Sequence, residues 1–235
     1  MTSPRRPVAI ITGASRGLGA ALARRLAEDG WTLVLDARGD AALRAVGDEL
    51  AGAGHDVRTA IGDVSDPAHR QALLDLAGGH LDALVNNASL LGPSPQPALA
   101  DYPAEELRRV YDVNVIAPLA LAASALPHLR ASKGCVVNIT SDAGVEAYEG
   151  WGGYGSSKAA LEHASRILAA EEEPNGVAVY VVDPGDMRTQ MHQEAFPGED
   201  ISDRPPPEVS VPGLVTLLRE RPPSGRYVAR EVTAP

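Results

Sequence analysis

The sequence alternates short apolar runs with longer amphipathic stretches, and this order most constrains what the chain can fold into. The runs have the length of strands, and the stretches between them carry apolar residues at helical spacing. Strict alternation implies right-handed crossovers, which predicts a mostly parallel sheet covered by helices on both faces. The expected strands are 8–12, 31–35, 57–61, 83–85, 135–139 and 177–182, and the expected helices are 18–28, 40–51, 67–76, 104–129 and 156–171.

Length and composition fit a single domain of this kind spanning residues 1–235. Hydrophobic residues make up 44% of the chain and aromatic residues only 4%, which favours an aliphatic core. The formal net charge of −10, with lysines and arginines scattered among acids, argues against binding to nucleic acid. Six histidines and one cysteine show no metal-ligand spacing, so we expect no metal site.

No segment approaches the roughly 20 apolar residues needed to cross a bilayer, and the apolar run at 8–11 is too short for a signal peptide. We therefore expect a cytoplasmic protein that does not bind membranes. Residues 186–212 show little periodicity and carry four prolines between Pro197 and Pro207. A loop this long usually covers a site, which predicts a mobile substrate lid. A last short helix at 211–219 and a closing strand in SGRYVAREV should follow.

A glycine-rich turn joins the first expected strand to the first expected helix, in the order TGASRGLG from Thr12. Gly13 would allow the tight turn, Gly17 the approach of a pyrophosphate, and Gly19 close packing of helix and strand. The free N–H groups and dipole at the helix N-terminus favour phosphate, so the turn predicts a dinucleotide site. The expected contacts come from Gly13, Ser15, Arg16, Gly17, Leu18 and Gly19.

The spacing Gly-x-x-x-Gly-x-Gly after a threonine resembles the first motif of the short-chain dehydrogenase/reductase family, and the resemblance extends over about residues 7–190. It implies a three-layer, doubly wound Rossmann fold and a homodimer or homotetramer. The second expected strand is followed by Asp36, Ala37 and Arg38. NAD-preferring relatives usually carry an acid at the position of Ala37, whereas NADP-preferring ones often carry arginine at Arg38. We expect NADP(H) over NAD(H), with Asp36 the residue that fits this pattern less well.

The resemblance assigns further cofactor contacts at the ends of later strands. Asp63 matches a carboxylate that contacts adenine, and Thr189 matches a residue that hydrogen-bonds the carboxamide. Ser89 stands where the family motif Asn-Asn-Ala-Gly has its glycine, which leaves the local backbone geometry open. The residues assigned in this way are Asp63, Val64, Asn87, Ala88, Pro184, Gly185 and Thr189.

Tyr154 and Lys158 lie four positions apart, so they would project from one face of a helix. A phenol is a poor catalyst at neutral pH, but a nearby ammonium and an oxidised nicotinamide favour its phenolate. By resemblance, both residues are catalytic and also contact the cofactor. Ser141, thirteen positions before Tyr154, matches the family serine that would stabilise charge on a carbonyl oxygen, and the neighbouring Thr140 would be structural. Asn114 matches a residue that holds a water of a proton relay.

These motifs predict an NADP(H)-dependent oxidoreductase that interconverts a carbonyl and an alcohol on a small organic substrate. One alternative is a regulator that senses the cofactor without turnover, although such proteins typically lose the Tyr–Lys pair. Another is a nucleotide-sugar epimerase or dehydratase, which needs a larger C-terminal part than the roughly 45 residues after Thr189. Four side chains of the expected lid could line an apolar pocket or anchor the loop: Met187, Met191, His192 and Phe196.

Overall fold

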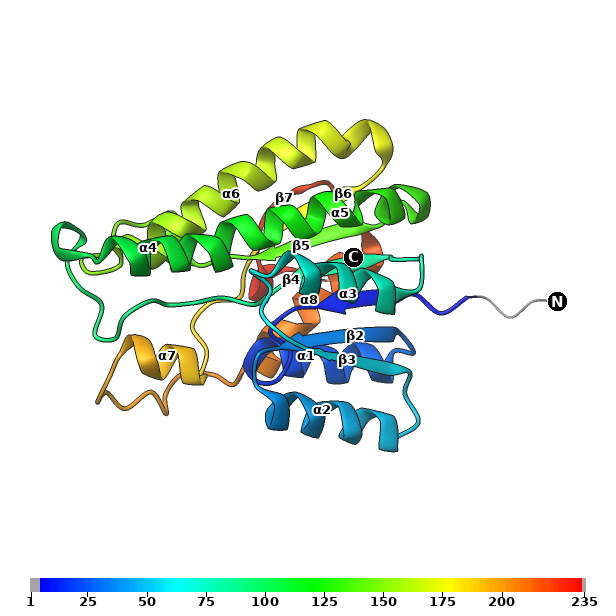
Figure 1. Ribbon diagram of the computed structural model, residues 1–235, viewed down its shortest axis with the longest axis horizontal. Helices are drawn as coiled ribbons and strands as arrows, with labels where there is room; N and C mark the ends of the chain where they lie inside the picture. The colour runs from blue at the N-terminus through cyan, green and yellow to red at the C-terminus, as the bar shows by residue number, and fades with distance from the viewer. Residues whose placement is uncertain (1–4, 234–235) are drawn as a thin grey trace.

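The computed structural model describes residues 5–233 and contains a seven-stranded sheet in the order β3-β2-β1-β4-β5-β6-β7 (Figure 1). Every neighbouring pair is parallel, so the sheet is entirely rather than mostly parallel. The strands are β1 (Val8–Ile11), β2 (Thr32–Ala37), β3 (Val57–Ile61), β4 (Ala83–Asn86), β5 (Cys135–Ile139), β6 (Ala178–Asp183) and β7 (Gly225–Val228).

Helices cover both faces of the sheet, as expected for three layers (Figure 1). Ile10 and Ile11 of β1 are both completely buried but belong to opposite cores, because successive side chains of a strand point to opposite faces. One face carries α1 (Gly17–Glu28), α2 (Asp40–Gly52) and α8 (Val211–Glu220). The other carries α3 (Pro67–Ala77), α5 (Ala117–Ser132) and α6 (Gly152–Glu172), with α4 (Ala104–Tyr111) leading into α5.

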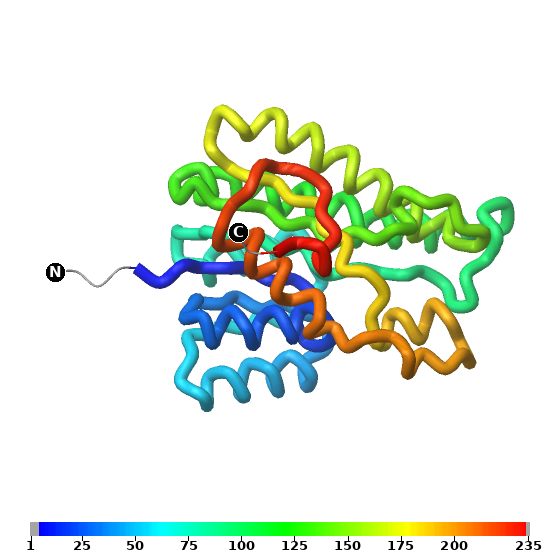
Figure 2. The backbone as a smooth tube through the Cα atoms, turned by 180° about the vertical axis from the view of Figure 1, so that it is seen from behind, coloured from blue at the N-terminus to red at the C-terminus, as the bar shows by residue number. Residues whose placement is uncertain are grey.

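The sheet order reverses beside β1, because the chain first adds β2 and β3 on one side and later adds β4 on the other. Ligands of open parallel sheets bind outside the carboxyl ends of the strands at such a switch point. Figure 2 shows the chain between β6 and α8 extending beyond this edge, on the side of the molecule opposite the N-terminus. The fold therefore places the glycine turn, the end of β4 and the expected lid around one crevice.

Two expected helices have different bounds in the structure. The helix expected at 104–129 is interrupted by a π-helical turn, Asp112–Ile116, which holds one residue more than an α-helical turn. The spacing of apolar residues did not reveal this turn. Helix α6 begins at Gly152 instead of residue 156, although glycine disfavours helices. Tertiary contacts explain these glycines, since a Cβ on Gly153 would lie 2.4 Å from the Tyr102 ring and one on Gly155 would lie 2.6 Å from the Ala143 oxygen.

The segment expected as a lid contains regular structure. Helix α7 (Gln190–Ala195) and a 3-10 turn, Pro207–Ser210, lie within it, and Ile201 and Ser210 are buried. The Arg188 N–H donates to the Pro205 oxygen at 2.8 Å, which joins the two sides of the segment. The last strand stops at Val228, before the end of the expected run, because a 3-10 turn follows. A role for this segment as a mobile lid stays a prediction.

We expected no segment long and apolar enough to cross a bilayer, but the continuous helical stretch of residues 104–132 is one. It contains an 18-residue window with a mean hydropathy of 1.4, which meets the length and composition of a membrane span. Half of that window is buried inside the fold, and Leu121 and Ala125 belong to the core beneath the sheet. Packing against the sheet therefore accounts for the apolar character of this stretch.

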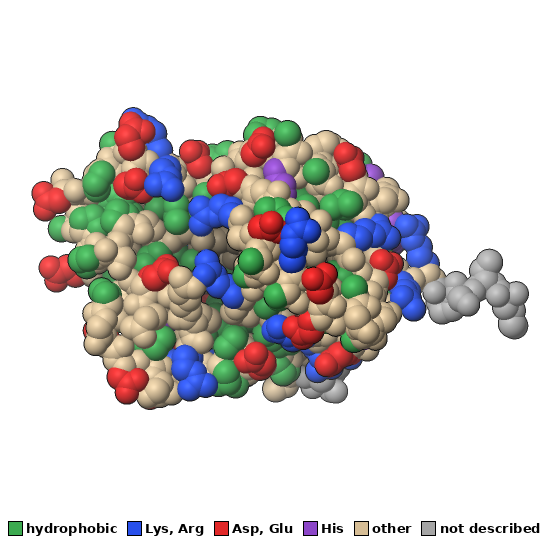
Figure 3. Space-filling model, turned by 60° about the horizontal axis from the view of Figure 1, so that its bottom comes forward, with side chains coloured by type: hydrophobic (Ala, Val, Ile, Leu, Met, Phe, Trp, Pro, Cys, Tyr) green, Lys and Arg blue, Asp and Glu red, His purple; other side chains and the backbone are tan. Residues whose placement is uncertain are grey.

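On the surface, acidic and basic side chains are interspersed on the face of the molecule shown in Figure 3.

Candidate active site

The glycine turn follows β1 and is packed too closely for side chains. Gly13 has a φ of 67°, and a Cβ there would lie 2.8 Å from the Ala88 Cα. A Cβ on Gly19 would lie 2.5 Å from the Gly13 oxygen, so Gly19 is required by contact with the turn itself, where we expected contact with the strand. Arg16 precedes α1 and makes no side-chain cap. The first N–H groups of α1 therefore suit an anion such as a pyrophosphate.

Side chains at the end of β1 and β4 hold this turn in place. The Thr12 hydroxyl accepts from the backbone N–H groups of Asn87 and Ala88, both at 3.0 Å. The Asn87 amide donates to the oxygens of Thr12 at 2.9 Å and Gly13 at 3.0 Å. Asn87 and Ala88 thus join the turn to β4 across the switch point. Their contact with the cofactor stays a prediction.

The acid at the end of β2 is paired inside the protein. Asp36 is 1% exposed, and its carboxylate lies 2.8 Å from the His69 Nε2 on α3. Burial raises the pKa of Asp36 to about 6, although hydrogen bonds from His69 and the Gly13 N–H act in the opposite direction. No motif pointed to His69. The only available signal was the rule that a buried acid in a strand needs a partner.

The residues expected near the adenosine differ in their exposure. Arg38 is exposed, and the Val64 side chain is buried. The pKa of Asp63 is lowered although burial opposes this, because Ser65 donates two hydrogen bonds and Arg38 contributes its positive charge. Arg16, on the other side of the turn, donates to the Gln190 side chain of α7. The glycine turn and the expected lid are therefore in direct contact.

Tyr154 and Lys158 lie on the first turns of α6 and are both buried. The Lys158 Nζ donates to the Ile139 oxygen at 2.9 Å and lies 5.3 Å from the centre of the Tyr154 ring. Burial lowers the pKa of Lys158 to about 8, and Glu162 opposes this shift. Burial also raises the pKa of Tyr154, whereas a hydrogen bond from Ser89 acts to lower it. Burial therefore sets the direction of this pKa shift, and the expected stabilisation of the phenolate by Lys158 and an oxidised nicotinamide stays a prediction.

Thr140 and Ser141 follow β5 and point to different surroundings. Thr140 is 2% exposed and donates to the Glu162 carboxylate at 2.8 Å. The Ser141 hydroxyl donates to Asp142 at 2.8 Å and accepts from the Ala143 N–H at 3.2 Å, and it lines the cavity described below. Thr140 lines the same cavity, so the choice of Ser141 over Thr140 for contact with a substrate stays a prediction.

Asn114 lies in the π-helical turn and is 1% exposed. Its amide donates to the Leu90 oxygen at 2.9 Å and to Ser157 at 3.0 Å, and its oxygen accepts from the Leu90 N–H at 2.7 Å and from Ser89 at 3.1 Å. These bonds satisfy the side chain. Any water of the predicted relay would therefore have to bind the main chain at Asn114.

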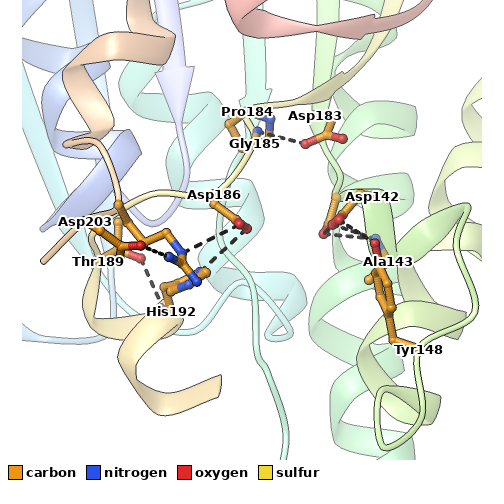
Figure 4. A network of polar contacts seen from close by, with 12 residues as sticks. Asp142, Ala143, Tyr148, Asp183, Pro184, Gly185, Asp186, Thr189, His192 and Asp203 are labelled. Carbon is orange, nitrogen blue, oxygen red and sulfur yellow. Dashed lines mark hydrogen bonds and ion pairs between the residues drawn. The ribbon is translucent and has the colours of Figure 1, made fainter. Parts of the chain in front are cut away.

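The segment after β6 forms the opposite wall of the site (Figure 4). The Gly185 N–H donates to Asp183 at 2.8 Å, and the Thr189 hydroxyl accepts from the His192 N–H at 3.2 Å at the start of α7. Arg226 of β7 contacts the carboxylates of Asp183 at 3.1 Å and Glu162 at 3.2 Å. Sequence reasoning missed Arg226, because only the folded sheet brings β7 next to β6.

A cavity of about 520 Å³ brings many of these residues together. Ser141 and Tyr154 line it together with Thr189 and the residues from Asp183 to Met187. Lys158 and Asn114 are buried residues that are not part of the lining. Within residues 5–233, no group of three or more His, Cys, Asp or Glu side chains could hold a metal ion. The lining also includes Leu91, Thr140, Asp142, Ala143, Tyr148, Glu149, Trp151, Met191, His192, Ala195 and Phe196.

The parallel sheet, its switch point and the glycine turn define a dinucleotide-binding α/β protein. Known proteins agree with this class. The family model described as short chain dehydrogenase matches residues 7–200. The chain is 34% identical over 196 residues to a benzil reductase ((S)-benzoin forming) from Saccharomyces cerevisiae, an alignment that covers 80% of this chain and 74% of that protein.

Solved structures give the same result. A short chain dehydrogenase from Pseudomonas syringae superposes with a TM-score of 0.88 at 32% identity, covering 94% of this chain and 93% of that one. A short chain dehydrogenase from Shigella flexneri 2a, complexed with NADP, gives a TM-score of 0.88 at 29% identity, with 95% and 97% covered. The chain belongs to the short-chain dehydrogenase/reductase family, and it is an NAD(P)-dependent oxidoreductase.

Proposed function

We propose that the protein interconverts a carbonyl and an alcohol on a small organic substrate by hydride transfer with NADP(H). The observation that carries this proposal is a single cavity lined by the hydroxyl groups of Ser141 and Tyr154 and, opposite them, by the segment from Pro184 to Thr189. Lys158 lies buried beside the Tyr154 ring. A phenol, a hydroxyl and an ammonium at the carboxyl edge of the sheet suit proton transfer at a carbonyl oxygen.

The residues present fit a dinucleotide. The glycine turn leaves no room for side chains where a pyrophosphate would approach, and the uncapped start of α1 offers free N–H groups. When bound, the nicotinamide supplies the hydride. Tyr154 then gives a proton to the substrate oxygen, and Ser141 orients that oxygen by a hydrogen bond. Lys158 binds the nicotinamide ribose and favours the ionised Tyr154, while Asn114 supports the relay of protons.

Three features support NADP(H) over NAD(H). The Asp36 carboxylate is held by His69 and the Gly13 N–H, so it is not free to accept from a ribose hydroxyl. The exposed Arg38 at the end of β2 suits a 2′-phosphate, and Arg16 supplies a second guanidinium on the glycine turn. The neighbour from Shigella is a complex with NADP. A single domain, a homodimer or homotetramer and a cytoplasmic location stay predictions.

Equilibrium binding of NADPH and NADH, followed by fluorescence, tests the cofactor. We expect NADPH to bind at least about tenfold more tightly, and Arg38→Ala to remove most of that preference, because a charged contact to a phosphate is lost. Arg44→Ala is the matched control, since Arg44 is an exposed arginine of α2 that pairs with Asp40. Tighter binding of NADH by the wild-type protein would reject NADP(H).

Replacement of Tyr154 by Phe tests the chemistry in the same protein. We expect kcat for reduction of a ketone to fall about 10²- to 10⁴-fold, because the proton donor is removed. The dissociation constant of NADPH should change little, which would show that the variant is folded. Full activity of Tyr154→Phe would contradict the proposed mechanism.

A further inference from the structure

The cavity beside Tyr154 is unusually rich in aromatic side chains for this protein. The chain contains only one Phe, two Trp and six Tyr. Four of these line the same cavity, namely Tyr148, Trp151, Tyr154 and Phe196. They come from two segments far apart in the chain: residues 148–154 at the start of α6, and Phe196 directly after α7. The fold therefore concentrates its few aromatic rings at one site.

Trp151 is the centre of this cluster. Its ring lies 5.8 Å from the rings of Tyr154 and Phe196, and 6.3 Å from the ring of Tyr148. The interplanar angles are 72° with Tyr154, 48° with Phe196 and 64° with Tyr148. Such tilted and edge-on arrangements are those that aromatic groups prefer. An aryl group beside Trp151 would thus have edges and faces of several rings to contact.

The remaining apolar lining extends this surface. Met187 and Met191 contribute two of the three methionines of the chain, and sulfur atoms contact aromatic rings favourably. The His192 ring lies 4.9 Å from the ring of Phe196, so it also forms part of the wall. Leu91 and Ala143 belong to a buried cluster with Tyr154. These contacts make one end of the cavity suitable for a flat apolar group.

The charges of the lining are of one sign. Four carboxylates contribute to it, from Asp142, Glu149, Asp183 and Asp186, and none of the lining residues is a lysine or an arginine. Asp183 is neutralised by Arg226, and Arg204 lies 3.8 Å from Asp186. Figure 4 shows Asp142 and Asp186 on opposite walls. The carboxylates of Asp142 and Glu149, which form no ion pair within residues 5–233, would therefore repel an anionic substrate but not a neutral one.

We propose that the substrate of this site is a neutral aryl ketone, in which the carbonyl carbon is bonded directly to an aromatic ring. This inference rests on the proposed carbonyl reduction. A ring beside Trp151 would lie next to Tyr154, because the two rings are 5.8 Å apart, and the attached carbonyl would share the cavity with Tyr154 and Ser141. NADPH gives its hydride to the carbonyl carbon and becomes NADP⁺, the C=O π bond breaks, and the oxygen takes a proton from Tyr154. The product is an aryl carbinol.

A pair of ketones of equal size tests the aromatic contact, namely acetophenone and cyclohexyl methyl ketone. The readout is the ratio of their kcat/KM values in each variant, because the intrinsic reactivities of the two ketones cancel between variants. We expect Trp151→Leu to lower the acetophenone-to-cyclohexyl ratio of kcat/KM about tenfold, mainly by raising the KM for acetophenone. Trp151→Phe should retain most of the wild-type ratio. Tyr227→Leu is the matched control, because Tyr227 forms a similar edge-on pair with Tyr180 at β7.

A second pair tests the charge of the lining, namely 4-acetylbenzoate and its neutral methyl ester. We expect the ester to have at least about a tenfold higher kcat/KM. Glu149→Gln should narrow that difference severalfold, because Glu149 is an exposed carboxylate of the lining. The exposed Glu105 of α4 lies outside the cavity, so Glu105→Gln should leave the difference unchanged.

The outcomes separate this inference from the proposed function. An acetophenone-to-cyclohexyl ratio unchanged in Trp151→Leu, with NADPH binding intact, overturns the aryl class while carbonyl reduction stands. Equal use of the benzoate and its ester overturns the neutral class in the same way. If NADPH binds but none of the four ketones is reduced, both the inference and the proposed function are overturned.

Discussion

The Asp36 carboxylate lies inside the sheet, where a charged group is costly unless it is paired. It contacts His69 of α3 on one side and the Gly13 N–H on the other. The same side chain therefore joins a helix, a strand and the turn expected to hold the cofactor phosphates. The pairing also agrees with the proposed preference for NADP(H), although Asp36 lies only two residues before Arg38.

The pKa of Asp36 gives a prediction for stability. Burial raises this pKa to about 6, against about 4 in an unfolded chain. The folded state then binds more protons between these values, so the contribution of Asp36 to the free energy of unfolding decreases as pH rises from about 4 to about 6. Urea unfolding at several pH values should show this slope in the wild-type protein and lose it in Asp36→Asn. The exposed Asp48→Asn variant should keep the slope, and a slope unchanged in Asp36→Asn would reject the assignment.

Strand β7 supports the site through its arginine, Arg226. Its Arg226 contacts Glu162 of α6 and Asp183 of β6, whose side chains are 5% and 10% exposed. Asp183 in turn fixes the Gly185 N–H, and Glu162 accepts from Thr140. One arginine thus positions both the helix that carries Lys158 and the turn after β6.

Replacement of Arg226 by Leu should lower both stability and activity. We expect a loss of roughly 2 kcal/mol in the free energy of unfolding, less than for a completely buried pair because Arg226 reaches solvent. We also expect kcat for ketone reduction to fall about tenfold with a smaller change in KM, because catalytic groups are misplaced. Chemical unfolding and initial rates measure these effects.

Arg219→Leu is the control for the Arg226 prediction, since Arg219 forms an ion pair with Asp29 at the surface. That variant should lose at most about 1 kcal/mol. Equal losses of stability and of kcat in Arg219→Leu and Arg226→Leu would show that Arg226 does not position the catalytic groups. Arg226→Lys should recover part of the lost activity, because it restores the positive charge.

Much at the element scale could be predicted from the sequence, and the exceptions have physical causes. Strands β3 and β5 both match their predicted ranges, although β5 is completely buried and β3 is a partly exposed edge strand. The π-helical turn around Asn114 was not predictable, since it does not alter the apolar pattern. Within the site, motif spacing predicted Ser141 and Tyr154. Trp151 and Arg226 belong to no motif. Trp151 lines the cavity, whereas Arg226 lies outside its lining and reaches the site only through Glu162 and Asp183 in the folded sheet.

Across the whole molecule, the segment between β6 and α8 touches both halves of the sheet. Gln190 accepts from Arg16 of the glycine turn, and the Glu194 oxygen accepts from Ser94 of the chain after β4 at 2.6 Å. The same segment supplies Met191 and Phe196 to the cavity. It therefore lies across the crevice and not along one of its edges.

This arrangement predicts an ordered reaction. Arg16 cannot bind a 2′-phosphate and Gln190 with the same donors, so we expect NADPH to bind first and the ketone second. In initial-rate experiments, NADP⁺ should inhibit competitively against NADPH, whereas the alcohol product should not. Gln190→Ala should tighten NADPH binding a few-fold, with Gln193→Ala as the control. Competitive inhibition of NADPH by the alcohol would indicate random binding instead.

The contact between Arg16 and Gln190 joins residues that are 174 positions apart in the chain. We expect the Arg16 guanidinium to serve two purposes: to bind the dinucleotide, and to hold α7 at the entrance to the cavity through Gln190. In such an arrangement the supply of reduced dinucleotide would set how often the entrance opens. The protein would then admit its ketone only when the means to reduce it is already in place.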